Sequence, residues 1–427
     1  MSFARQSLGS LAALVIGVLV SVLLPRILGP DGRGEYQLAI KVAALVLAVA
    51  QWGIPEVLLQ RLAERRSAQG VLIGTSLALG LAGAIVVALI LAAAAPLFED
   101  NLLKGVSPIL LALALFGSLA SLIGLLARRF IQLGGRLDIY NGLDIGRTVL
   151  FLVLVIVGGM LLPRQALGPT LAWLIGELAL ATLAMLFLLR HTPRWSVSPE
   201  VARDLATSGA PIQFGLIGMF IGSEGGAFVL NANLDIAAVG IYAVAMSASR
   251  LVLQISVALR TALQPRLMGS EQDSGAMTAR VTRHGLLWMV LIAIGLAIGS
   301  PLAPLIFGRD FSAVSPALVL LLPGMVAYGV WQLLASHLLR IGRRGFLAVV
   351  AWLFGITSIV LQAFGAQMFG VVGASAGLSV AYVLAMLIIL VAFLQLSGRS
   401  LRELLPAAGD LAFYVGLTRR ALARNAA

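Results

Sequence analysis

Several charged side chains stand inside long apolar segments of this 427-residue chain. On insertion scales a charged group at the centre of a bilayer costs about 2.5–3.5 kcal/mol or more, so it must pair, reach the membrane surface or serve a function. Lys41 and Arg250 would suit an anionic group, the lysine as a point charge and the arginine as a bidentate fork. Glu56, Glu177 and Glu224 would neutralise such cations, carry protons or contact headgroup water.

The position of each basic residue in its segment decides between a cavity and the membrane surface. Lys41 lies about one and a half turns into its segment, with Gln37 one turn earlier on the same face, and both locations stay open for it. Arg250 lies deeper, with Gln254 one turn later, and is expected to face a cavity. Arg260 is near the end of the same segment and is expected to reach the surface.

The acidic residues also differ in their position along the apolar segments, which favours different roles for them. Glu56 is close to the end of its segment, where contact with headgroup water is the expected role. Glu224 lies near the middle of its segment, within Gly222-Ser-Glu-Gly-Gly226. It is the best candidate for ion coupling or for pairing with Arg250. For Glu177 the three roles stay open.

The composition indicates the kind of protein that positions these residues. The chain is 60% hydrophobic and 11% charged, whereas soluble domains carry about 25% charged residues. We therefore expect an all-α integral membrane protein without a separate soluble domain. Cysteine is absent and the three histidines are scattered, which argues against disulfides, thiolate chemistry and an HExxH zinc site. No cofactor is expected.

Twelve apolar segments are long enough to span a bilayer, six in each half of the chain. They are about Leu8–Leu28, Tyr36–Gln60, Val71–Leu97, Ser107–Ala127, Leu143–Leu162, Leu167–Leu189, Gly209–Leu230, Ile236–Gln264, Gly285–Phe307, Val314–Leu339, Phe346–Phe364 and Val371–Leu396. They predict two six-helix bundles, residues 1–190 and 207–396. A linker over residues 191–206 joins them, and a basic amphipathic tail follows over residues 397–427.

Lysine and arginine are distributed unevenly between the two sides of the predicted membrane. One side holds 21 of the 30 basic residues and the other holds five. Because Lys and Arg are retained in the cytoplasm, both termini and the linker are expected to be cytoplasmic. The formal net charge of +12 then reflects membrane topology and does not point to nucleic acid.

Two short matches indicate that the halves are repeats. At a shift of 206 residues, Leu28, Gly34, Tyr36 and Ala39 recur as Leu234, Gly240, Tyr242 and Ala245. Six spans is an even number, so the copies would be parallel repeats, related by an axis along the membrane normal, around a central cavity. Chance is the alternative, because Gly, Leu and Ala dominate the composition.

The sequence resembles a known family at three places. They are Leu24-Pro-Arg-Ile-Leu-Gly-Pro-Asp-Gly-Arg-Gly-Glu-Tyr-Gln-Leu-Ala39, Gly53-Ile54, and Leu-Asp-x4-Gly-Ile-Tyr-Ala-x-Ala in the second half. These residues are similar to the Wzx-like polysaccharide flippases of the multidrug/oligosaccharidyl-lipid/polysaccharide exporter superfamily. The resemblance implies that undecaprenyl-pyrophosphate-linked oligosaccharide repeat units are moved from the inner to the outer leaflet of the bacterial inner membrane by alternating access.

The resemblance also implies partners and a binding site. The partners would be the lipid-linked oligosaccharide, membrane lipids and other polysaccharide-assembly proteins. Lys41 and Arg250 would hold the pyrophosphate, with Gln37 and Gln254 beside them. Lipid II flippases of the same superfamily use basic residues of the first, second and eighth spans, which would add Arg26.

Two other functions stay open. A cation-coupled multidrug antiporter of the same superfamily would rely on acidic groups and an aromatic pocket, whereas cationic spans favour an anionic substrate. A membrane polysaccharide polymerase or ligase would need large outer loops that carry catalytic groups, and the predicted outer loops are short. The chain is therefore expected to be non-enzymatic, and without a GxxxxGK[ST] motif it is not expected to hydrolyse ATP.

Overall fold

The computed structural model describes residues 2–64, 69–162, 165–192, 194–269 and 273–406. Over these residues the chain forms helices and no strand, as expected for an all-α protein. The α-helices are α1 Ser2–Ala50, α2 Ile54–Glu64, α3 Gln69–Phe98, α4 Pro108–Leu133, α5 Leu137–Leu161, α6 Leu167–His191, α7 Pro199–Glu224, α8 Gly226–Asn233, α9 Ile236–Ser249, α10 Leu253–Gly269, α11 Ser274–Gly299, α12 Ala303–Phe307, α13 Val314–Arg340 and α14 Arg344–Ser397. Most of the predicted tail, residues 407–427, lies outside the described part.

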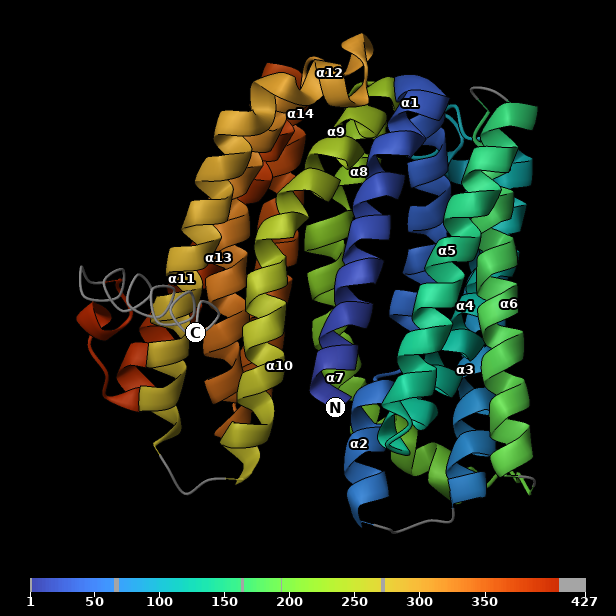
Figure 1. Ribbon diagram of the computed structural model, residues 1–427, viewed down its shortest axis with the longest axis vertical. Coiled ribbons are helices and arrows are strands. Elements are labelled where there is room, and N and C mark those ends of the chain that lie inside the picture. The colour runs from blue at the N-terminus through green and yellow to red at the C-terminus, as the bar shows by residue number, and fades with distance from the viewer. Residues whose placement is uncertain (1, 65–68, 163–164, 193, 270–272, 407–427) are drawn as a thin grey trace, which may run out of the picture.

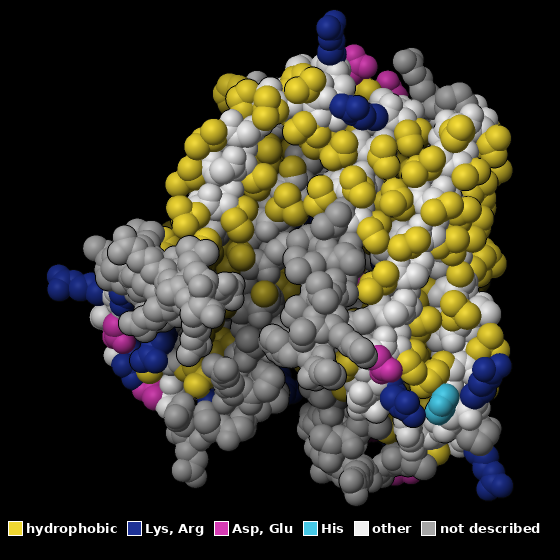
Figure 2. Space-filling model, viewed as in Figure 1, with side chains coloured by type: hydrophobic (Ala, Val, Ile, Leu, Met, Phe, Trp, Pro, Cys, Tyr) yellow, Lys and Arg dark blue, Asp and Glu magenta, His cyan; other side chains and the backbone are white. Residues whose placement is uncertain are grey.

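The chain is a multi-pass membrane protein. In the described part, nine helical stretches are long and apolar enough to cross a membrane. Figure 2 shows hydrophobic side chains over the upper and right-hand parts of one face, with charged side chains at the top, at the left and at the lower right. The apolar parts of this surface suit lipid, and the charged parts suit water.

Two helices contain a break, and each break lies between two of the predicted spans. The 54 residues of α14 would form a straight helix about 80 Å long, far more than the hydrocarbon thickness of about 30 Å. Phe369 and Gly370 leave the helical conformation, and Gly373 packs against Gly365, so the chain reverses there. In α1 the break is at Gly29. The count of twelve spans, with two parallel repeats, stays a prediction.

The second predicted span, residues 36–60, is not one helix. It is interrupted at Trp52 and Gly53, which have positive φ values of 49° and 63°. The buried side chain of Gln213 on α7 satisfies the polar groups that the break frees. It donates to the carbonyl of Ala48 and accepts the Gly53 N–H at 2.9 Å. The prediction of one continuous helix was wrong because both hydrogen bonds that stabilise the break come from Gln213, which is far along the chain.

The helices gather in two groups (Figure 1). In this view α2 to α6 lie on the right and α10, α11, α13 and α14 on the left, with α1, α7 and α9 between them. One cluster of buried apolar residues comes almost wholly from the second half of the chain, and two others come mainly from the first half. At the upper end α1, α9 and α12 converge, whereas α2 and α10 are apart at the lower end.

Helices α1 and α9 touch backbone to backbone near the upper end. A Cβ atom on Gly34 would lie 1.8 Å from the carbonyl oxygen of Ile236, and one on Gly240 would lie 2.0 Å from that of Pro30. Only glycine permits so close an approach. Gly34 and Gly240 are also the glycines matched at a shift of 206 residues. Equivalent residues meet on a two-fold axis, so this contact supports the predicted repeat.

Candidate functional site

Lys41, Glu224 and Arg250 form one ion-pair cluster between the two halves of the chain, here called the charged triad. The Glu224 carboxylate accepts a hydrogen bond from Arg250 Nη2 at 2.5 Å through Oε1. Its other oxygen, Oε2, pairs with the ammonium of Lys41. One carboxylate therefore connects α1, from the first half, with two segments of the second half.

Breaks in the helices present two members of the triad. Glu224 is the last residue of α7, and Arg250 begins a single 3₁₀ turn, Arg250–Val252, between α9 and α10. A carboxylate at a helix C-terminus is unfavourable by itself, and two cations beside it offset that cost. Gly222 and Gly226 flank Glu224 and leave no room for a Cβ against Phe354 and Gln362 of α14. These two glycines thus pack the junction of α7 and α8 closely on α14.

The triad is enclosed on one side and open on the other. The side chains of Lys41 and Glu224 are 13% and 19% exposed, whereas 41% of the Arg250 side chain is accessible. Arg250 also lies near the middle of the candidate span Ile236–Thr261. An arginine that is both deep in its span and accessible can be reached by a further anion.

Arg33 adds a further positive charge that the sequence reasoning missed, because Arg33 was placed in an outer loop. Arg33 is only 7% exposed. It donates to Gln37 at 3.0 Å and its guanidinium lies 5.5 Å from the centre of the Tyr36 ring. Arg33, Gln37 and Lys41 are spaced by four residues, so they form one stripe along α1. That spacing is the signal that could have identified Arg33.

Two predicted binding residues lie away from this stripe. Arg26 is exposed and donates to the carbonyls of Leu305 and Ile306 in α12, at 2.5 and 2.6 Å. Gln254 is exposed on α10. Of the five residues predicted to bind substrate, the structure brings Lys41 and Arg250 together on Glu224. Gln37 lies one turn before Lys41 on α1 and is bonded to Arg33.

The other two acidic candidates are also separate from the triad. Glu177 of α6 is buried and pairs with Arg147 of α5 at 2.9 Å. Arg147 lines a pocket of about 280 Å³ together with Tyr36 and Trp173, between α1, α5 and α6. Glu56 is exposed in the first turn of α2.

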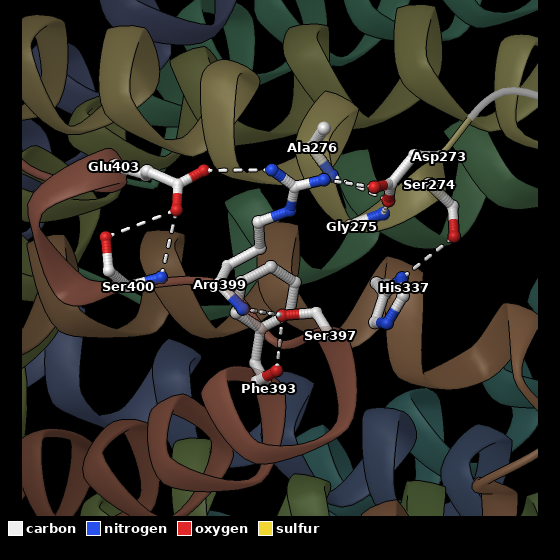
Figure 3. Close-up of polar contacts among 10 residues, drawn as sticks. All are labelled: Asp273, Ser274, Gly275, Ala276, His337, Phe393, Ser397, Arg399, Ser400 and Glu403. Carbon is white, nitrogen blue, oxygen red and sulfur yellow. Dashed lines mark hydrogen bonds and ion pairs between the residues drawn. The ribbon is translucent and has the colours of Figure 1, made fainter.

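A second polar cluster lies where α11 begins and α14 ends (Figure 3). Asp273 caps α11 by accepting the N–H of Gly275 at 2.8 Å and that of Ala276 at 3.1 Å, and it pairs with Arg399. Arg399 also reaches Glu403 at 3.3 Å. Because the Asp273 carboxylate is already occupied by these partners, it does not form a nucleophilic triad with Ser274 and His337, which are hydrogen-bonded to each other nearby. The cluster is a structural clasp.

The stability that the clasp gives to the fold should depend on pH. The Ala276 N–H first, and the Arg399 hydrogen bond next, hold the pKa of Asp273 below its usual value. Such a carboxylate stabilises the fold above its unfolded pKa, near 4, and that contribution is lost as the pH falls through the lower folded value. We expect Arg399→Gln to lower the Tm slightly at pH 7 and less at pH 3, measured by scanning fluorimetry. Arg402→Gln is the control, and equal effects of Arg399→Gln at both pH values would contradict this account.

Long apolar helices in two groups, with a charged cluster between them, define an all-α multi-pass membrane protein. Residues 4–270 match the family described as "Polysaccharide biosynthesis protein". This match covers more than half of the chain, which therefore belongs to that family. No curated protein matches the chain.

Solved structures of similar fold are transporters. "Lipid II flippase MurJ, inward closed conformation" has a TM-score of 0.76 and 14% identity, covering 97% of this chain and 93% of that one. The MATE multidrug transporter DinF-BH has a TM-score of 0.68 and 17% identity, covering 91% and 92%. A Vibrio cholerae MATE transporter, VcmN, has a TM-score of 0.60 and 16% identity, covering 92% and 95%. At these identities the likeness shows the fold alone.

Proposed function

We propose that this protein is a flippase for undecaprenyl-pyrophosphate-linked oligosaccharide repeat units in the bacterial inner membrane. The observation that carries the proposal is the charged triad, with two cations and one carboxylate between the halves of the chain. Membership of the polysaccharide biosynthesis family supports a glycan pathway. The fold shared with a lipid II flippase supports a lipid-linked substrate.

The charges suit a pyrophosphate. Lys41, Arg250 and Arg33 carry three positive charges against the single negative charge of Glu224, so the region has a net charge of +2. A pyrophosphate diester carries about two negative charges. Its oxygens would take the place of the Glu224 carboxylate on Arg250, in the bidentate geometry that guanidinium favours, and on Lys41.

The proposed cycle follows from where the triad lies. Lys41 belongs to the predicted bundle of residues 1–190, and Glu224 and Arg250 belong to that of residues 207–396. With both termini in the cytoplasm, as the basic residues predict, the lower end in Figure 1 faces the cytoplasm. A substrate headgroup would enter from the inner leaflet at that end. Alternating access would then rock one bundle against the other.

A multidrug antiporter is the second candidate. The observation that favours it is the pocket lined by Tyr36, Phe151 and Trp173, since aromatic faces attract organic cations. Arg147 lines the same pocket and pairs with Glu177, so the pocket already holds a cation of its own. This arrangement favours the flippase. A polymerase or ligase has less support, because the described residues contain no cluster that could hold a metal and the clasp does not form a nucleophile.

Loss of the protein should trap its substrate. In a deletion strain we expect complete lipid-linked repeat units to accumulate on the inner leaflet, where a membrane-impermeant lectin or oxidant added from outside does not reach them. Complementation with the wild-type chain should restore access. Single units that are exposed outside but unpolymerised would favour a polymerase. Unchanged glycan lipids together with increased sensitivity to cationic dyes would favour the antiporter.

A further inference from the structure

The connection between α6 and α7 is fixed against α3. Here residues 194–198 are called the strap. A Cβ atom on Gly70 would lie 2.0 Å from the Arg194 carbonyl oxygen, and one on Gly74 would lie 2.5 Å from that of Ser196. The strap thus lies directly on the helix backbone and forms a defined wall at this end of the molecule.

A pocket of about 320 Å³ lies between the strap and helices α3, α4 and α6. It is lined mainly by apolar side chains, among them Leu77, Leu81, Ile123, Met185 and Trp195. Ala78 and Val197, which also line it, are exposed, so the pocket opens toward the surroundings of the protein. An apolar pocket that opens at the end of membrane-spanning helices is accessible to lipid chains.

The pocket lies next to unbalanced positive charge. Arg190 and Arg194 are both exposed, and residues 190–199 contain no acidic residue. Arg190 is in the last turn of α6, the helix whose Met185 lines the pocket. Arg194 directly precedes the lining residue Trp195 in the strap. Both arginines therefore add positive charge at the end of α6 next to the pocket.

Trp195 gives a further indication. Its indole Nε1 is buried and has no hydrogen-bond partner. Tryptophan is enriched at membrane interfaces, where its ring contacts lipid chains and its N–H meets polar groups of the headgroup region. A tryptophan in the wall of an apolar pocket at this end of the helices fits a lipid as the occupant.

We propose that this pocket binds an anionic phospholipid of the surrounding bilayer. One acyl chain fills the space between the strap and α3, and Arg190 and Arg194 hold the phosphate. Basic pockets between transmembrane helices bind acidic lipid headgroups in this way. Since the strap is part of the connection between the two predicted bundles, the bound lipid stabilises that connection. The site is separate from the charged triad and does not depend on the proposed substrate.

The test uses the full chain purified in dodecyl maltoside, with phosphatidylglycerol or phosphatidylcholine added. We expect phosphatidylglycerol to raise the Tm and to be retained in native mass spectrometry, and phosphatidylcholine to do neither. Arg190→Ala with Arg194→Ala should weaken phosphatidylglycerol binding about tenfold, because two contacts to a charged group are lost and each is weakened by its exposure to solvent. Arg203→Ala removes an exposed arginine of α7 and is the matched control.

A second variant tests the pocket without changing charge. Ala78→Phe places a ring at the exposed rim and should reduce binding of phosphatidylglycerol while leaving the Tm of the lipid-free protein nearly unchanged. Equal binding of both lipids, or full binding by the double arginine variant, would overturn the proposal. Displacement of the phospholipid by an equimolar amount of undecaprenyl pyrophosphate would also overturn it, since the pocket would then belong to the substrate.

Discussion

Replacing Lys41 and Arg250 together by alanine is expected to abolish display of surface polysaccharide. In a cavity walled by protein, a hydrogen bond to a charged group contributes about 1.5–3 kcal/mol, so each residue should account for about ten- to a hundredfold in substrate capture. Lys41→Arg keeps the charge and should retain most function. Arg250→Lys should be intermediate, because lysine cannot reproduce the bidentate contact of arginine.

The measurement is surface polysaccharide in a deletion strain complemented with each variant at matched membrane levels. Arg260→Ala is the control, since this exposed arginine of α10 lies ten residues from Arg250 in the same candidate span. Wild-type display from the double alanine variant would end the assignment of the triad to substrate binding. It would leave the flippase proposal to be judged by the fate of the lipid-linked units.

Glu224→Gln is expected to have opposite effects on stability and on anion binding. Removing one partner of a buried ion pair costs about 3–5 kcal/mol, and the 41% exposure of the Arg250 side chain lowers that cost. The Tm of the variant should therefore fall. With no carboxylate to displace, geranyl pyrophosphate should bind at least tenfold more tightly and should restore much of the lost Tm. Transport should nevertheless decrease, because release of the anion is no longer assisted.

These effects are measured on the purified protein by scanning fluorimetry and by calorimetric titration with geranyl pyrophosphate. Glu200→Gln, at an exposed position in the first turn of α7, is the matched control and should change neither property. Weaker binding of geranyl pyrophosphate to Glu224→Gln would show that Glu224 contributes to the site by some means other than competition with the anion.

The sequence predicted what depends on local pattern. Apolar segments and their charged members follow from composition and spacing, and among those members are Lys41, Glu224 and Arg250, which the structure brings together. Which residues pair depends on tertiary packing. Arg26 donates hydrogen bonds to α12, nearly 280 positions along the chain. No local sequence pattern predicts such bonds.

The breaks in the helices were harder to predict for the same reason. Residues 36–60 contain no proline before Pro55, so their apolar pattern favours one continuous span. The structure bends the chain at Trp52 because Gln213 satisfies the freed polar groups. Arg33 was misplaced because its neighbours Gly32 and Gly34 are typical of a loop. In the structure Gly34 is helical and serves the contact with α9.

The contact between Gly34 and Gly240 closes the upper end of the molecule without interlocking side chains. Helical backbone has already satisfied its own hydrogen bonds, so parting α1 from α9 would expose no unpaired donor or acceptor to lipid or water. Farther along the two helices, Leu38 of α1 shares a buried apolar cluster with Val239 and Tyr242 of α9. The resistance to outward opening would then come from this apolar packing and from the ion pairs of the charged triad, and a bound anion can alter only the second.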